Sequence, residues 1–112
     1  MVDRIYSIDE IKNIVAPIAL KYDVERVFLF GSYAKGKASI VSDLDFVIDK
    51  GRLRGLRFAG MLGDLQENFD KNVDLLTFDS LNKTEANDYT SLKKRIEKDM
   101  VLIYGNADNE RF

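Results

Sequence analysis

Two short apolar segments joined by a glycine-containing loop constrain the fold more than any other feature of this chain. Arg26–Phe30 is rich in strand-forming residues and ends at Gly31. Residues 44–48 alternate apolar and other side chains, so that Leu44, Phe46 and Ile48 would share one face. Both segments therefore predict β-strands, the first of them buried.

The segment before the first strand predicts a helix. Ser7 and Glu10 have the spacing of a capping box, in which each side chain bonds the other residue's backbone N–H. Apolar residues then recur at helical spacing. Pro17 falls inside this pattern and is expected to remove one backbone hydrogen bond and to kink the helix.

The rest of the chain alternates helices and strands. A second helix is predicted after residue 57, a third strand at residues 73–76, a third helix at residues 91–98 and a last strand at residues 101–104. We therefore expect an α/β (α+β) domain, with a small mixed sheet of about four strands and helices packed on it. Residues 105–112 are expected to form a frayed tail. The apolar positions that define the second helix are Phe58, Met61, Leu62, Leu65 and Phe69.

Composition narrows the functional classes. The 112 residues suit one domain, residues 1–112, with one modest core. A net charge of −2 gives no general argument for nucleic-acid binding through a basic surface. The absence of cysteine and histidine means that any metal must have oxygen ligands, which favours Mg²⁺, Mn²⁺ or Ca²⁺ over zinc. No signal-like or membrane-spanning apolar run occurs, so we expect a cytoplasmic protein.

Three aspartates form the main candidate site. Asp43 and Asp45 stand two residues apart on the second strand, so their side chains point the same way. Two such carboxylates repel unless a cation neutralises them, and a divalent ion is the natural partner. Asp74 is flanked by apolar residues in the third strand. If the two strands are neighbours, the three carboxylates can hold one or two Mg²⁺ ions, with Mn²⁺ as an alternative. For an isolated D-x-D, a turn residue beside a solvent-facing strand residue would be the commoner explanation.

The loop after the first strand is the second candidate. Gly31 permits a tight turn whose backbone N–H groups can receive phosphate oxygens, and Ser32 adds a hydroxyl donor. Lys35 and Lys37 bring positive charge nearby. By itself a Gly-Ser pair is more often an ordinary turn.

The same loop nearly matches a P-loop, G-x-x-x-x-G-K-[ST], but fails on two points. Position 38 is alanine, which lacks the hydroxyl that binds Mg²⁺. A P-loop also runs directly into a long helix, whereas the four residues 38–41 leave room for about one turn. The carboxylates, rather than Lys37, are therefore expected to work with the glycine loop.

Taken together, the stretches GSYAKG (31–36), SDLDF (42–46) and VDLL (73–76) resemble the polymerase-β-like nucleotidyltransferase superfamily. The signature of that superfamily is Gly-Ser, a short helix, D-x-D on a strand and a third Asp on a later strand. The short chain is similar to the minimal nucleotidyltransferases (MNT), which are commonly paired as antitoxins with HEPN-domain toxins. The resemblance covers most of the chain and implies the polymerase-β-like fold.

The resemblance also implies roles. Gly31 and Ser32 would bind nucleotide phosphates, Asp43 and Asp45 would ligate two metal ions, and Asp74 would ligate the catalytic metal and help to deprotonate the attacking hydroxyl. The implied activity is transfer of AMP from ATP, or of another nucleotide, to a partner protein, with a tyrosine hydroxyl as a plausible acceptor. A HEPN-domain toxin would be that partner, in an assembly with this chain. The alternative is a non-catalytic antitoxin that neutralises its partner by contact alone.

Three features stay open at this level. Lys35 stands where the family often has Arg. Lysine keeps the positive charge but lacks the planar guanidinium that can bind phosphate with two hydrogen bonds. Tyr33 could cover a nucleotide base or pack on the sheet. The basic stretch at residues 50–57 could contact phosphates or an acidic partner, although a solvated loop is the commoner explanation.

Overall fold

The computed structural model describes residues 5–49, 53–77 and 98–105. In these ranges the chain forms three helices and four strands, joined mostly by short turns. Within the described ranges their order is that predicted from the sequence, and the short helix after the first strand is the one that the resemblance implied. The elements are α1 (Ile8–Tyr22), β1 (Arg26–Phe30), α2 (Gly31–Ala34), β2 (Leu44–Asp49), α3 (Leu56–Phe69), β3 (Val73–Thr77) and β4 (Val101–Tyr104).

The four strands form one mixed sheet in the order β3-β2-β1-β4. β1 pairs antiparallel with both β2 and β4, whereas β2 and β3 are parallel. A parallel pair needs a crossover connection, and α3 supplies it. The predicted α+β class with a four-stranded mixed sheet is therefore confirmed.

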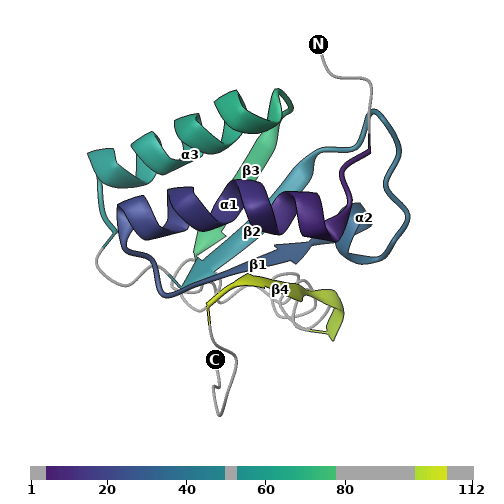
Figure 1. Cartoon of the computed structure of the whole chain (residues 1–112), viewed down its shortest axis with the longest axis horizontal. Coiled ribbons are helices and arrows are strands. Elements are labelled where there is room, and N and C mark those ends of the chain that lie inside the picture. The colour runs from purple at the N-terminus through teal and green to yellow at the C-terminus, as the bar shows by residue number, and fades with distance from the viewer. Residues whose placement is uncertain (1–4, 50–52, 78–97, 106–112) are drawn as a thin grey trace, which may run out of the picture.

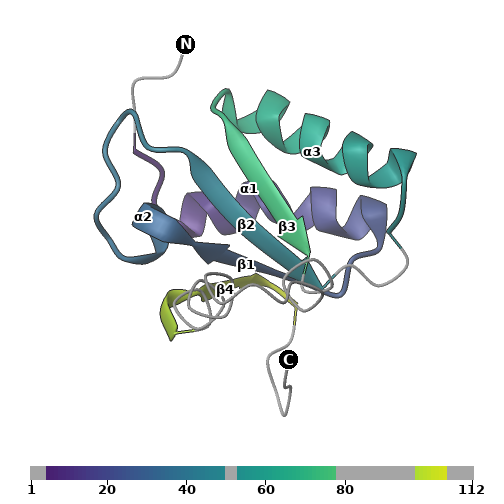
Figure 2. The ribbon, with the colours of Figure 1, turned by 180° about the vertical axis from the view of Figure 1, so that it is seen from behind.

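Helices α1 and α3 lie side by side on one face of the sheet (Figure 1), and the opposite view places the strands in front of them (Figure 2). The two helices run antiparallel, as shown by contacts between the chain just before α1 and the last residue of α3. There the Tyr6 hydroxyl donates a 2.7 Å hydrogen bond to the carbonyl of Phe69, and their rings pack edge to face. Apolar side chains fill the space between helices and sheet. Fully buried members include Ile11, Val15, Leu29, Leu44, Phe46, Ile48, Met61 and Leu65.

The alternation of β2 divides its side chains between two faces, as the sequence predicted. Leu44, Phe46 and Ile48 point into the core under the helices. Val47 points to the other face, where it packs with Phe28 in a separate small cluster. Asp45 has the same parity as Val47 and therefore lies on the face away from α1 and α3.

Helix α1 begins with the predicted capping box. The Glu10 N–H donates to the Ser7 hydroxyl at 3.1 Å, and the Ser7 N–H donates to the Glu10 carboxylate at 2.9 Å. Pro17 stands inside the helix, which continues to Tyr22, so the proline does not end it. The helix terminates at Asp23, whose left-handed conformation (φ 59°) turns the chain toward β1.

Some predictions lie outside the described residues. The helix expected at residues 91–98 falls there except for its last residue, as does nearly all of the expected tail at 105–112. Within the described ranges, no helix is long and apolar enough to cross a membrane.

Candidate active site

The glycine turn directly follows β1. Gly31 has a φ of 75°, a conformation that side-chain-bearing residues rarely adopt, and it opens the one-turn helix α2. The Lys35 N–H donates to the Gly31 carbonyl at 3.1 Å, and the Lys37 N–H donates to the Ser32 carbonyl at 2.9 Å. The helix has therefore ended before Lys37, which excludes a P-loop and confirms the short helix that the resemblance implied.

Asp45 and Asp74 lie directly opposite one another in the parallel pair β2–β3. The sequence predicted three clustered carboxylates only on the condition that these strands are neighbours, and the register meets that condition. The exposures differ, because Asp45 is half-buried in an inner strand while Asp74 is exposed on the edge strand. The Asp45 carboxylate is thus held within the sheet, whereas the Asp74 carboxylate is accessible to an incoming molecule.

The glycine turn and the carboxylates meet at Asp45. Phe30 is the antiparallel register partner of Asp45, so the next residue, Gly31, comes against the Asp45 side chain. A Cβ atom on Gly31 would lie 3.3 Å from Asp45 Cγ and closer still to the carboxylate oxygen Oδ2. A Cβ atom here would force the Asp45 carboxylate to move, so glycine allows the approach that places the loop proposed to hold phosphate next to the carboxylate proposed to hold metal.

The environment of Asp45 disfavours its ionised form. Burial, hydrogen bonding with the Asp74 side chain and the negative charges of Asp74 and Asp43 raise the Asp45 pKa from 3.8 to about 7. The raised pKa means that Asp45 is partly protonated near neutral pH, and a cation beside it would favour the ionised form.

These residues fit a divalent cation in their chemistry. Carboxylate oxygens are the ligands that Mg²⁺ and Mn²⁺ prefer. A bound cation would take the place of the proton on the Asp45 carboxyl. Asp43 is exposed just before β2 and would supply the third carboxylate. In the described ranges, no three acidic side chains already surround a common point closely enough to hold an ion. Metal ligation by Asp43, Asp45 and Asp74 therefore stays a prediction.

Lys35 lies just past α2 and is half-exposed. Its ammonium nitrogen is 3.8 Å from a carboxylate oxygen of Asp99, which precedes β4. Such an exposed pair contributes little to stability, so Lys35 can exchange this partner for another anion at small cost. Nucleotide binding by Gly31, Ser32 and Lys35 stays a prediction.

Two residues left open by the sequence lie within the described ranges, Tyr33 and Arg57, whereas residues 50–52 of the basic stretch lie outside them. Tyr33 is only 5% exposed and belongs to the main core, so it packs under the sheet rather than covering a base. Arg57 comes from the basic stretch and stacks over the ring of Tyr22, with 5.4 Å from guanidinium carbon to ring centroid. Arg57 belongs to α3, which packs on one face of the sheet (Figure 1), whereas Asp45 lies on the other face, so the sheet separates Arg57 from Asp45.

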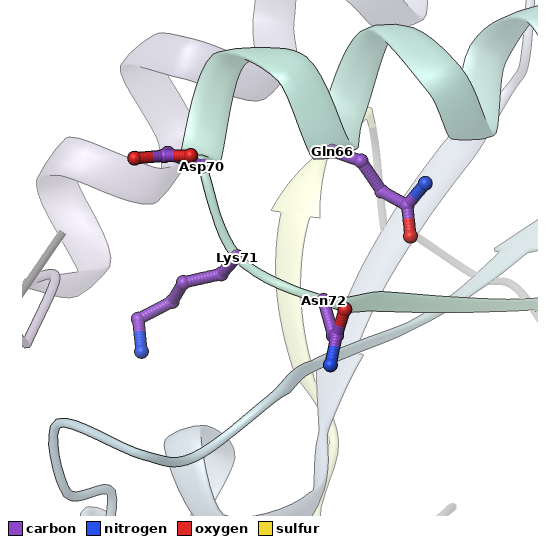
Figure 3. Close-up of a pocket in the computed structure, with 4 residues that line it drawn as sticks. All are labelled: Gln66, Asp70, Lys71 and Asn72. Carbon is purple, nitrogen blue, oxygen red and sulfur yellow. The ribbon is translucent and has the colours of Figure 1, made fainter. Parts of the chain in front are cut away.

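Sequence reasoning placed Lys71 and Asn72 at a turn before the third strand but did not predict the contacts that this turn makes. Gln66, Asp70, Lys71 and Asn72 line a cavity of about 430 Å³ there (Figure 3). Lys71 also reaches the loop that precedes Asp43 and donates to the carbonyls of Ile40 and Ser42. A lysine in a polar turn carries no sequence signal for such contacts, because their acceptors are backbone atoms about thirty residues earlier.

Comparisons with known proteins find relatives of this chain by sequence. A candidate protein adenylyltransferase of Methanocaldococcus jannaschii is 37% identical over 76 residues, covering 67% of this chain and 82% of that protein. A second candidate protein adenylyltransferase of the same organism is 33% identical over 105 residues, covering 87% and 98% of the two chains.

Solved structures share the fold at lower identity. A chain from the crystal structure of a toxin–antitoxin with AMP-PNP superposes with a TM-score of 0.67 at 20% identity, covering 88% of this chain and 76% of its own. A chain from the complex of a tri-AMPylated Shewanella oneidensis HEPN toxin with an MNT antitoxin gives a TM-score of 0.62 at 18% identity, with coverage of 88% and 73%. The sequence profile of the nucleotidyltransferase domain matches residues 8–103. The chain therefore belongs to the nucleotidyltransferase domain family and is an enzyme of that type.

Proposed function

We propose that this enzyme transfers AMP from ATP to a hydroxyl group of a partner protein, and that the partner is a HEPN-domain toxin. The observation that carries the proposal is the meeting of Asp45 with Asp74 across β2–β3 and with Gly31 at the end of β1. The relatives named as candidate protein adenylyltransferases and the fold shared with toxin–antitoxin complexes support the class of acceptor.

In the proposed reaction, an acceptor oxygen forms a bond to the α-phosphorus of ATP. The bond from that phosphorus to the oxygen bridging to the β-phosphate breaks, and pyrophosphate leaves. The backbone N–H groups at Gly31 and the hydroxyl of Ser32 would hold the β- and γ-phosphates in line with the acceptor, which supplies much of the rate gain. Lys35 would contribute one positive charge beside these phosphates.

The carboxylates would handle charge and the proton. Mg²⁺ would be held by Asp43, Asp45 and Asp74. When bound, the ion would neutralise negative charge on the phosphates. Asp74 is exposed at the sheet edge and would accept the acceptor's hydroxyl proton at its carboxylate. Asp45 would be ionised in this state, because a bound cation favours the charged form of the carboxylate and so counters its raised pKa.

The test follows label from ATP into protein. The full chain, Mg²⁺ and either α-labelled or γ-labelled ATP are mixed with extract of the native cells as the source of acceptor. We expect label from the α position alone, in one acceptor band. The Asp43→Asn/Asp45→Asn variant should lose it, whereas the charge-matched control Glu25→Gln/Glu67→Gln, both exposed, should retain it.

Two results would contradict the proposal. Label from the γ position that survives the double variant would mean that another chemistry operates. No transfer from any nucleoside triphosphate, together with partner neutralisation that survives Asp43→Asn/Asp45→Asn, would favour the antitoxin that acts by contact alone.

A further inference from the structure

The backbone on both sides of Asp43 is held by two consecutive residues of the α3–β3 turn. On one side, the ammonium of Lys71 donates to the carbonyl of Ser42 at 3.1 Å and to that of Ile40 at 2.7 Å. On the other side, the N–H of Leu44 donates to the carbonyl of Asn72 at 3.1 Å. The backbone before Asp43 and the backbone after it are therefore both hydrogen-bonded to the same short turn.

The same turn leads directly into β3. Asp74 follows Asn72 by two residues, so the element that fixes the backbone of Asp43 also sets the start of the strand that carries Asp74. Across the pair, Asp74 is in register with Asp45. The turn thereby connects the backbone that carries Asp43 to the strand pair that carries Asp45 and Asp74.

Lys71 is the side-chain part of this connection. The loop has a small turn of its own, in which the Ser42 N–H donates to the Ser39 carbonyl at 3.0 Å and the Ser39 N–H donates to the Ser42 hydroxyl at 2.9 Å. These bonds shape the loop internally but do not tie it to the sheet. The charged donor of Lys71 does so, and hydrogen bonds from charged donors are stronger than neutral ones.

We propose that Lys71 is a positioning residue for the nucleotidyl transfer. It fixes the Ser42–Asp43 backbone so that the Asp43 carboxylate faces the same cation as Asp45 and Asp74. This role rests on the proposed function. Lys71 lies outside both the D-x-D motif and the Gly-Ser motif. Lys71 also lines the cavity of Figure 3 beside Gln66 and Asn72, which leaves room for a longer side chain there.

Three variants test the role. Lys71→Met keeps the aliphatic stem and removes the charge and donors, whereas Lys71→Arg keeps both. Lys12→Met, at an exposed position of α1, is the matched control for loss of one lysine charge. If Lys71→Met does not fold, Lys71→Gln, which retains an N–H donor, replaces it.

The first measurement is amide hydrogen exchange of the metal-free protein. We expect the Ser42 and Leu44 amides to exchange at least about tenfold faster in Lys71→Met, and at the wild-type rate in Lys71→Arg and Lys12→Met. The second is Mn²⁺ binding, followed by electron paramagnetic resonance. The dissociation constant should rise roughly tenfold in Lys71→Met, as happens when a residue that orients metal ligands is removed. In the transfer assay, kcat should fall by a similar factor while the KM for ATP changes less than about twofold.

The outcomes separate the two proposals. Unchanged amide exchange together with unchanged Mn²⁺ binding in Lys71→Met would overturn the positioning role, whatever the activity. If the wild type transfers no nucleotide but Lys71→Met still frees the two amides, the proposed function fails and the structural connection stands. A loss of activity that Lys71→Arg does not restore would also contradict the role, because arginine supplies equivalent donors.

Discussion

Gly31 packs so closely against the side chain of Asp45 that a Cβ atom at position 31 would displace the Asp45 carboxylate. The contact follows from the register, since Asp45 lies opposite Phe30 and the chain turns at the next residue. A single backbone-to-carboxylate contact thus joins the loop proposed to hold phosphates to the residues proposed to hold metal.

Replacing Gly31 with alanine should impair both stability and activity. The positive φ costs about 1–2 kcal/mol for any residue with a Cβ, and overlap with Asp45 adds to this. Gly36→Ala is the matched control, because Gly36 has a similar φ of 72° but open space around it. Urea unfolding should show a loss of about 1 kcal/mol for Gly36→Ala and at least about 2 kcal/mol for Gly31→Ala. Equal losses would mean that the contact with Asp45 has no energetic effect.

The metal-free protein should lose stability as the pH rises through 7. The Asp45 pKa is raised from 3.8 to about 7 in the folded state, so folding favours the protonated form. The stabilising contribution is full below about pH 4 and is lost as the pH rises through 7. After discounting for solvent screening, we expect a loss of about 1–2 kcal/mol.

Urea unfolding in EDTA between pH 5 and 9 measures this slope, with Asp45→Asn as the comparison. That variant cannot ionise and should be flatter across the interval. The same slope in both proteins would place the titration on another residue. Adding Mg²⁺ at pH 8 should restore stability to the wild type more than to Asp45→Asn.

Tyr33→Phe should stabilise the domain. The Tyr33 hydroxyl is buried and has no hydrogen-bond partner among the described residues, so removing it removes a desolvation cost of about 1 kcal/mol. Tyr6→Phe provides the contrast, because the Tyr6 hydroxyl donates to the Phe69 carbonyl and its removal leaves a buried acceptor. Thermal unfolding should therefore shift upward for Tyr33→Phe and downward for Tyr6→Phe. A downward shift in both would indicate that the Tyr33 hydroxyl is satisfied in solution.

Lys35→Met should weaken nucleotide binding without changing stability. Its ammonium nitrogen is 3.8 Å from a carboxylate oxygen of Asp99 and both side chains are partly exposed, so the loss should stay within about 0.5 kcal/mol. ATP affinity, measured by calorimetry with Mg²⁺, should fall severalfold. Asp99→Asn breaks the same ion pair and should leave ATP affinity at or above the wild-type value. If both variants bind ATP equally well, Lys35 does not contact the phosphates.

The strands and the capping box could be predicted because each has a local sequence signal. Alternation marked Leu44, Phe46 and Ile48 as a core face, and the recurrence of aspartate in an apolar strand marked Asp74. The pairing of Asp45 with Asp74 could be stated only conditionally, because register depends on which strands become neighbours. Tyr33 could not be placed, since one amphipathic side chain suits a core or a ligand equally well. Lys71 was missed because its acceptors are main-chain carbonyls, which every sequence has.

The crossover from β2 through α3 to β3 has a consequence for how this domain can change over evolutionary time. Every residue proposed for phosphate, metal and proton handling lies in one unbroken run, from the end of β1 to the start of β3. Substitutions or insertions beyond Thr77 therefore leave the order of these residues intact. The residues proposed for the chemistry are confined to this run, whereas α1 and β4 complete the core and the sheet around them.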